Sequence, residues 1–226
     1  EVSGQIYLIQ GAALLRIESD GTATSLGTVP GDPGATISGN NGKVTVVSGG
    51  KYYVIDGEAH NEITGGACAD LGHVGFFNQF TILTEENGRR VQWSDPADPK
   101  TLNGLNFASA ESDDDDIIRG MAVGGEYWIF KQRSIERWGA SSTGGIAPFP
   151  GATRQIGLKS KKLATQIPDG AFFIGSDNVT YLAAGGQMQP ISSAWVNDAV
   201  SNSTPIRTIY FEDEGQKFCA IVFSGR

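Results

Sequence analysis

The feature that most limits what this chain can fold into is an internal repeat. An apolar run, a turn and a second run rich in aromatic or β-branched residues recur along the chain, and the sixth apolar run has no second run after it. The apolar runs begin at residues 6, 44, 80, 127, 172 and 218, so successive repeats start 36 to 47 residues apart. Short strands at this spacing indicate a series of small antiparallel sheets.

Turn residues separate the two runs of several repeats, as in Ser48-Gly49-Gly50, Glu86-Asn87-Gly88 and Ser176-Asp177-Asn178. Gly and Asn accept the positive φ that tight hairpin turns require, and the chain contains 31 Gly. Weaker strand patterns flank the central hairpins. Those before the hairpins include residues 120–123 and 163–165, and those after them include residues 22–26 and 187–191. The sequence therefore predicts four strands in each unit.

A small sheet with two apolar central strands must bury both faces, which packing against neighbouring sheets around an axis achieves. We therefore predict an all-β fold, a β-propeller of about six blades, each a four-stranded antiparallel sheet. We expect residues 1–226 to form a single propeller domain, as a fragment of a longer chain whose first and last blades are incomplete. A pair of small β domains and a jelly roll are the alternatives, in which the regular spacing would be accidental.

The charge balance disfavours tight binding to duplex DNA. The chain has 17 Lys and Arg against 25 Asp and Glu, a formal net charge of −8. A specific DNA-binding protein usually presents a basic face. The only short basic run here contains Lys159, Lys161 and Lys162. No apolar stretch of the given sequence approaches the length of a membrane span, and the charged-then-apolar pattern of a signal peptide does not occur within it.

The cysteine and histidine residues predict no metal centre or redox motif. Cys68 and Cys219 are far apart in sequence, and neither belongs to a CxxC motif. Because Cys219 lies in the apolar run 218–223, we expect it to be a small buried strand residue. A disulfide between the two cysteines is neither favoured nor excluded. His60 and His73 are isolated, whereas a zinc site needs more ligands at closer spacing.

The most conspicuous charged segment is Asp113-Asp114-Asp115-Asp116. Calcium-binding loops such as the EF-hand alternate their carboxylates and include an essential Gly, and four consecutive Asp residues without that Gly cannot present every carboxylate to one ion without strain. We therefore expect a solvated acidic loop between blades, with Asp116 capping the strand that begins at Ile117.

We also searched for the chemistry of a glycosidase, because paired carboxylates facing each other across a sugar are its requirement. The stretch 94–99 is only faintly similar to the Asp-box turn of sialidases, since Pro99 stands where that turn needs Gly. The arginines that could grip a carboxylate are confined to the middle of the chain: Arg89, Arg90, Arg119, Arg133, Arg137 and Arg154. No Gly-x-Ser-x-Gly nucleophile elbow is present. We expect no catalytic residue, no cofactor and no metal, and hence no enzyme.

The tryptophans could form an aromatic platform for carbohydrate, although large aromatic residues more often fill the space between blades. We expect Trp128 to serve in packing. Trp93 and Trp138 remain open to either role, and Trp195 falls in a connection after the strand that ends near Ile191.

The middle of the chain resembles a known family. Residues 91–96, Val-Gln-Trp-Ser-Asp-Pro, are followed by residues 116–121, Asp-Ile-Ile-Arg-Gly-Met. Residues 126–130 and 134–138, Ser-Ile-Glu-Arg-Trp, come next, and smaller matches follow at 157–158, 171–175 and 206–210. This pattern is similar to that of the packaged-DNA stabilisation proteins of short-tailed bacteriophages, also called tail hub or nozzle proteins. The resemblance covers roughly residues 70 to 224.

The resemblance implies a structural virion protein of the tail that assembles in the bacterial cytoplasm. It implies a hexamer-like ring of the full-length protein, placed below the portal, with the portal or adaptor and other tail proteins as partners. Such a ring retains packaged DNA and later lets it pass, and a weakly charged or acidic wall would let duplex DNA slide without tight binding. The alternatives are a carbohydrate-binding or sialidase-like propeller and a bacterial propeller that recruits another protein.

Overall fold

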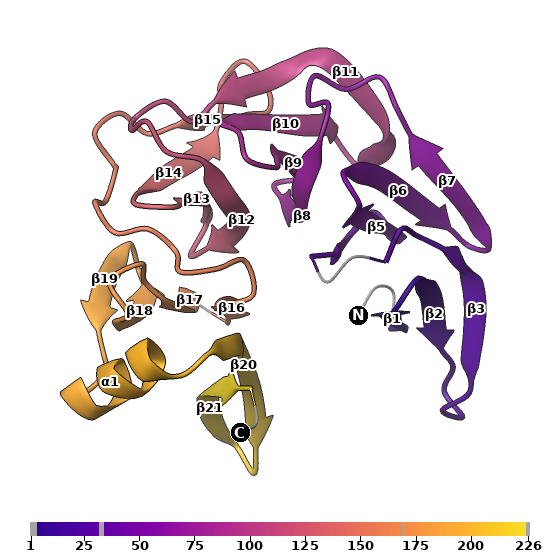
Figure 1. Ribbon diagram of the computed structural model, residues 1–226. Coiled ribbons are helices and arrows are strands. Elements are labelled where there is room, and N and C mark those ends of the chain that lie inside the picture. Colours follow the sequence, from indigo (N-terminus) through magenta and orange to yellow (C-terminus); the bar gives the residue numbers. More distant parts are fainter. Residues whose placement is uncertain (1–3, 32–33, 169, 225–226) are drawn as a thin grey trace. The chain divides into compact units, whose positions relative to one another are not determined.

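The computed structural model describes residues 4–31, 34–168 and 170–224, and within them the chain folds into six antiparallel sheets (Figure 1). Contacts divide the chain into two compact units. Unit 1 comprises Glu1–Glu111 and Ala140–Ala147, and unit 2 comprises Ser112–Gly139 and Pro148–Arg226. Whether the whole chain acts as one domain stays a prediction.

Unit 1 contains the first three sheets, in which strands adjacent in sequence are also paired. The first has three strands, β1 (Ile6–Gln10), β2 (Ala13–Ile17) and β3 (Ala23–Thr28). The second has four strands, β4 (Thr36–Asn40), β5 (Lys43–Ser48), β6 (Lys51–Asp56) and β7 (Ala59–Ile63). The third has β8 (Leu71–Phe77), β9 (Phe80–Glu85), β10 (Arg90–Asp95) and β11 (Asp98–Ser109).

The other three sheets follow in the same chain order. The fourth sheet has β12 (Ile117–Val123), β13 (Glu126–Lys131), β14 (Ile135–Ala140) and the short β15 (Ile146–Pro148). The fifth has β16 (Ala164–Ile167), β17 (Gly170–Ile174), β18 (Thr180–Ala184) and β19 (Gln187–Pro190). The sixth has only β20 (Pro205–Asp213) and β21 (Gln216–Phe223) among the described residues. The predicted repeat, with complete middle sheets and incomplete end sheets, is confirmed.

The second sheet shows why the apolar runs are continuous rather than alternating. Val44 and Val46 of β5 pack in one buried cluster, whereas Val47 of the same strand packs in another. Successive strand residues point to opposite faces, so both faces of this sheet are buried. In β6, Tyr53 packs in the cluster of Val44 and Val46, and Tyr52 packs in the cluster of Val47.

Unit 2 has its own core, formed between the fourth and fifth sheets. Trp128, Phe130 and Ile135 pack against Phe173 and Tyr181. The Phe130 and Phe173 rings meet edge to face with centroids 5.2 Å apart, and the Phe173 and Tyr181 rings stack at 5.3 Å. Aromatic pairs in these geometries add to the free energy gained from burial alone.

The predicted turn residues occupy the backbone conformations that the turns require. Gly49 and Gly50 have φ of 56° and 77°, and Asn87 and Asn178 have φ of 50° and 67°. These are left-handed conformations, which glycine adopts without strain and asparagine tolerates.

The helix α1 (Ala194–Asn202) was not predicted from the sequence. Val200 of this helix is fully buried beside Leu163 and Ile174 of the fifth-sheet region. A nine-residue helix is marginal by itself in water, so this packing stabilises it. No helix among the described residues has the length and hydropathy needed to cross a membrane.

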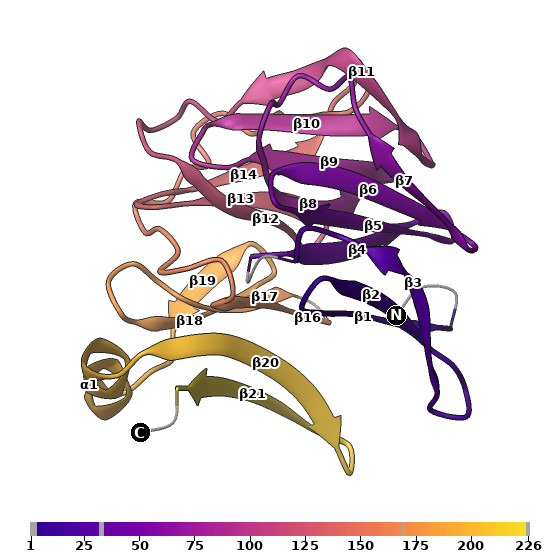
Figure 2. The same cartoon turned by 45° about the vertical axis from the view of Figure 1, so that its right-hand side comes forward.

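The expectation that Cys219 is buried is wrong, although its assignment to a strand is confirmed. The Cys219 side chain is exposed on β21, which has β20 on one side and no further strand among the described residues (Figure 2). The equivalent strands β5, β9, β13 and β17 each lie between two strands and are buried. The apolar composition of β21 is that of a central strand, but its position here is that of an edge.

Candidate functional site: a buried ion network at the acidic loop

The acidic loop before β12 is held by buried charges. The expectation of a fully solvated loop is wrong for Asp115, whose side chain is 1% exposed. Its carboxylate lies against the turn between β13 and β14, where Lys131 and Ser134 are also fully buried. Asp114, by contrast, is exposed, as expected of the loop.

Both oxygens of the Asp115 carboxylate accept hydrogen bonds. Oδ1 accepts from the Ser134 hydroxyl at 2.9 Å and lies 3.1 Å from Lys131 Nζ. Oδ2 accepts the backbone N–H of Arg133 at 2.6 Å and that of Ser134 at 3.1 Å. The carboxylate therefore takes the place of a backbone acceptor at the β13–β14 turn.

A second carboxylate, that of Glu136 on β14, completes the network. Its Oε1 accepts from Lys131 Nζ at 3.3 Å and from the Ser112 N–H at 3.0 Å, and its Oε2 accepts the Trp138 indole N–H at 3.2 Å. Lys131 Nζ also donates to the Asp113 carbonyl at 2.6 Å. One buried cation thus lies between two buried carboxylates, and every charged group has hydrogen-bond partners.

The pKa of Asp115 reflects two opposing effects, burial and hydrogen bonding. Burial raises the pKa of this carboxyl, but hydrogen bonds from Arg133 N–H, Lys131 and Ser134 outweigh burial and leave the pKa below its ordinary value. The group is therefore ionised at neutral pH. A general acid or base would need a pKa closer to neutrality, so the network is suited to fixing the loop rather than to proton transfer.

The opposite face of β14 carries a second ion pair. Arg137 donates to Glu126 from Nε at 2.6 Å and from a terminal nitrogen at 2.5 Å, a bidentate contact. The Trp128 indole N–H donates to the same carboxylate at 3.0 Å. The hydrogen bond from Arg137 lowers the pKa of Glu126.

The site residues that sequence reasoning missed are Asp115, Lys131, Glu136 and the Arg137–Glu126 pair. A usable signal was present, because Ser134-Ile135-Glu136-Arg137-Trp138 places two adjacent charges inside a strand otherwise made of core residues. A charge in such a position must be paired when buried. Asp116 does not cap β12 with its side chain, whose Oδ2 instead lies 3.5 Å from Gln132 Nε2.

The tryptophans on strands are buried, which answers the question left open for Trp93 and Trp138. Trp128 and Trp138 are 1% and 0% exposed, and Trp93 is 9% exposed. They therefore do not offer their rings to a sugar. Trp195 lies in α1 and is 77% exposed, but it stands alone among the tryptophans in this respect.

Four of the six arginines considered for gripping a carboxylate, Arg90, Arg119, Arg133 and Arg137, donate side-chain hydrogen bonds within the protein. Arg89 and Arg90 belong to unit 1, and Arg119, Arg133, Arg137 and Arg154 belong to unit 2. Arg133 donates to the Asp114 carbonyl at 2.9 Å, and Arg90 donates to the Ala67 carbonyl at 3.1 Å. The stretch 94–99, which was compared with the Asp-box turn of sialidases, contains the turn that joins β10 to β11, and Ala97 in this turn has a φ of 55°.

The cysteines and histidines form no metal centre in the part of the chain that the structure describes, where no group of three potential ligands occurs. Both cysteines are free thiols. Burial raises the pKa of Cys68 to about 12, so this thiol is not activated. His60 stacks on Tyr53 with ring centroids 5.1 Å apart, and His73 is buried in β8.

Unit 1 contains a cavity of about 270 Å³ whose lining includes Tyr52, Cys68 and Gln92. The Gln92 side-chain carbonyl accepts the N–H groups of Ala67 at 2.9 Å and Cys68 at 3.1 Å. A cavity of this size and mixed polarity accommodates water molecules, and we assign no larger ligand to it.

Comparisons with solved structures show what fold this series of sheets forms. The dihydro-heme d1 dehydrogenase NirN matches 98% of this chain with a TM-score of 0.65 and 11% identity. The extracellular domain of a putative one component system from B. thetaiotaomicron matches 96% with a TM-score of 0.60 and 10% identity. PorZ, of the type-IX secretion system of Porphyromonas gingivalis, matches 84% with a TM-score of 0.55 and 11% identity. The matches cover 50%, 30% and 27% of those chains, respectively, so this chain spans half or less of each.

Such low identities show similarity of fold alone, and the family comparison gives that fold as a β-propeller, as predicted. The family comparison is more specific. A family model described as phage stabilisation, "Bacteriophage P22 Gp10, beta-propeller", matches residues 1–214. The chain belongs to this family of phage proteins, as the resemblance of its middle segments implied. A search of curated proteins finds no match.

Proposed function

We propose that this chain is part of the tail hub, or nozzle, of a short-tailed phage, where it helps retain packaged DNA and forms part of the conduit through which DNA is ejected. The observation that carries the proposal is the family match over residues 1–214. In this proposal the full-length protein forms a hexamer-like ring on the portal or adaptor in the virion, assembled in the bacterial cytoplasm.

The site supports a structural role rather than an enzymatic one. The segment of the resemblance at residues 134–138 places Glu136 and Arg137 in ion pairs on opposite faces of β14. Lys131 contacts the carboxylates of both Asp115 and Glu136, and all three side chains are buried, so they offer no side chain to a substrate. Fixed charges of this kind position strands and loops.

The experiment that tests the proposal is a mass measurement in solution. The longest natural form of the chain would be measured alone and after mixing with the portal and adaptor proteins of the same phage, with the portal of an unrelated phage as control. We expect a ring that binds only the matching portal complex. A monomer that ignores the portal but is retained on a glycan array would overturn the proposal in favour of the carbohydrate-binding alternative.

A further inference from the structure

Four basic residues of unit 2 lie close together in the fold, although the chain as a whole is acidic. Some exposed cations of the chain pair with carboxylates, as Lys51 does with Glu62 at 3.1 Å and Lys100 with Asp56 at 2.8 Å. In unit 2, by contrast, Arg119, Lys162 and Arg207 have no carboxylate partner in the described part of the chain. We call Arg119, Lys161, Lys162 and Arg207 the basic cluster.

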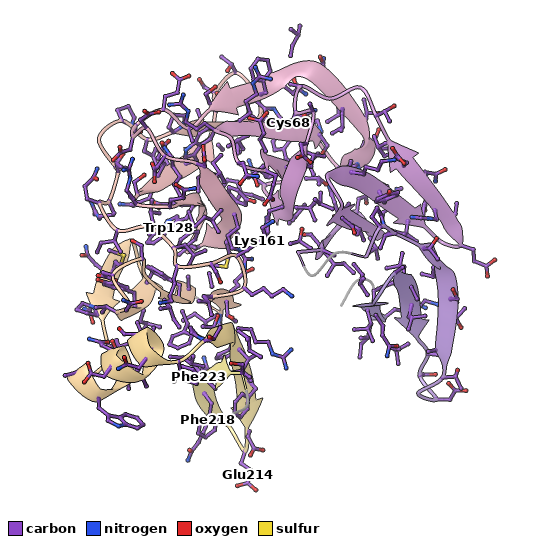
Figure 3. The ribbon with its side chains drawn as sticks, in the orientation of Figure 1. Cys68, Trp128, Lys161, Glu214, Phe218 and Phe223 are labelled. Carbon is purple, nitrogen blue, oxygen red and sulfur yellow. The ribbon has the colours of Figure 1, made fainter. Side chains whose placement is uncertain are left out.

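Hydrogen bonds join the segments of the chain that carry these four residues. The Arg119 guanidinium donates to the Lys161 carbonyl at 3.0 Å and to the Ala164 carbonyl at 2.8 Å. The N–H of Thr208, next to Arg207 in β20, donates to the Lys162 carbonyl at 3.1 Å. The loop that carries Lys161 (Figure 3) therefore lies between the start of β12 and β20.

The loop of the basic cluster is fixed in position. Leu163 is 1% exposed and packs with Ile174 and Val200. The N–H of Ile174 donates to the Leu163 carbonyl at 2.9 Å, and the N–H of Lys159 donates to the Ile174 carbonyl at 3.1 Å. Cations on a fixed loop lose less conformational entropy when they bind an anion than cations on a mobile loop.

Arg119 adds a desolvated positive charge to the cluster. It is half-buried, and burial lowers its pKa to about 10, which still leaves it charged at neutral pH. The guanidinium donates to two carbonyl groups, which are dipoles and do not neutralise its charge. Lys162 and Arg207 are exposed, so their charges reach solvent.

We propose that the basic cluster contacts the phosphate backbone of duplex DNA. The proposal rests on the proposed function, and it identifies the surface of unit 2 that meets the DNA. Exposed cations on a loop and on a separate strand match a linear polyanion better than a single phosphate ion, which would need a closed pocket. Phosphate contacts carry no base information, so this binding is independent of sequence.

The small number of cations sets the strength of the interaction. Each phosphate contact on a duplex contributes about 0.9 to the slope of log affinity against log salt concentration. Three or four contacts would reduce affinity by about 40- to 150-fold between roughly 50 and 200 mM salt, by the same relation. DNA would thus be contacted weakly and could slide, in agreement with the net charge of −8.

The test is a titration of a fluorescent duplex with the full chain at several salt concentrations. The cluster variant is Lys162→Gln/Arg207→Gln, in which both altered side chains are exposed, and thermal melting would check that it folds. The matched control, Lys51→Gln/Lys100→Gln, removes the same charge from paired cations. We expect the salt slope to fall by about two in the cluster variant and to stay unchanged in the control, for two duplexes of unrelated sequence.

The proposal is overturned if the wild-type chain does not bind duplex at low salt, or if the cluster variant binds as the wild type does. Displacement of the duplex by polyglutamate at equal charge concentration would also overturn it, since the cluster would then fit an acidic protein. Ring formation on the portal does not depend on these outcomes. A chain that assembles but fails the titration keeps the proposed function and loses this contact surface.

Discussion

Replacing Asp115 by Asn would test whether the buried ion network holds the acidic loop. The substitution preserves the shape of the side chain and removes its charge. One oxygen that now accepts becomes an NH₂ group, which can only donate. The NH₂ group must face either the N–H groups of Arg133 and Ser134, or Lys131 Nζ and the Ser134 hydroxyl.

The second orientation costs less, because the Ser134 hydroxyl can rotate and accept. The contact between Asp115 and Lys131 Nζ, 3.1 Å in the wild type, is then lost. A hydrogen bond to a charged group contributes about 1.5–3 kcal/mol, and the remaining bonds weaken when their acceptor becomes neutral. Lys131 keeps Glu136 and the Asp113 carbonyl, so the loss stays below the full cost of an orphaned buried charge. We expect a destabilisation of about 3 kcal/mol.

The assay is urea unfolding followed by tryptophan fluorescence, since Trp138 belongs to the network and is fully buried. A loss of about 3 kcal/mol would lower the melting temperature by roughly 6–12 °C in a protein of this size. Asp114→Asn is the matched control, because it makes the same chemical change in the adjacent exposed side chain. We expect it to change the free energy of unfolding by less than about 0.5 kcal/mol.

The pH dependence provides an independent check. The pKa of Asp115 is lowered in the folded state, so its contribution to stability is present above its unfolded pKa and is lost as pH falls through the folded value. The difference between wild type and Asp115→Asn should therefore shrink below about pH 4. A variant within about 0.5 kcal/mol of wild type at pH 7, or a difference that grows in acid, would refute the reasoning.

Three further outcomes follow from the structure. Cys219 is exposed and should react with a thiol reagent much faster than Cys68, whose pKa is raised to about 12. The Cys68→Ser variant keeps only Cys219 and the Cys219→Ser variant keeps only Cys68, so equal rates of reaction for the two variants would contradict this. Gly157→Ala should destabilise by several kcal/mol in chemical unfolding, because its Cβ would lie 2.1 Å from the Gln132 carbonyl oxygen. Trp195 is exposed, so Trp195→Ala should leave the free energy of unfolding within about 0.5 kcal/mol of the wild type. If the wild type were retained on a glycan array and this variant were not, the carbohydrate-binding alternative would be supported instead.

The order of the strands could be predicted from the sequence because each sheet is built from neighbours in the chain. The hairpin of β5 and β6, for instance, is specified by two apolar runs and the Gly49-Gly50 turn between them. Local pairing of this kind needs no knowledge of distant residues. The helix α1 could not be found in this way, because it is stabilised chiefly by the burial of Val200 against residues far away in sequence.

Burial in the sixth sheet could not be predicted for a related reason. The run that contains Cys219 is as apolar as the central strands of other sheets. Whether such a strand is covered depends on the strands beside it, and within the described part of the chain β21 pairs with β20 alone. Phe211 and Phe218 consequently stack on each other in the hairpin while each stays about two-fifths exposed or more.

The acidic loop illustrates a further limit, because four identical residues have different environments. Nothing local distinguishes Asp115 from Asp114. The difference comes from the turn at Arg133 and Ser134, which presents two N–H groups to one carboxylate. The sequence could indicate that a buried charge such as Lys131 needs a partner, but it could not say which aspartate supplies it.

The two charged residues of β14 can specify its register against β13, which its apolar residues cannot do. A strand buried on both faces has no polarity difference to specify its register, although a slip by one residue would move every side chain to the opposite face. Glu136 and Arg137 are adjacent, so they point to opposite faces, and their partners Lys131 and Glu126 lie at opposite ends of β13. A slip by one residue would bring Glu136 to the face of Glu126 and would leave Lys131 without this partner. The register of this sheet is therefore specified electrostatically, by two ion pairs on opposite faces of β14.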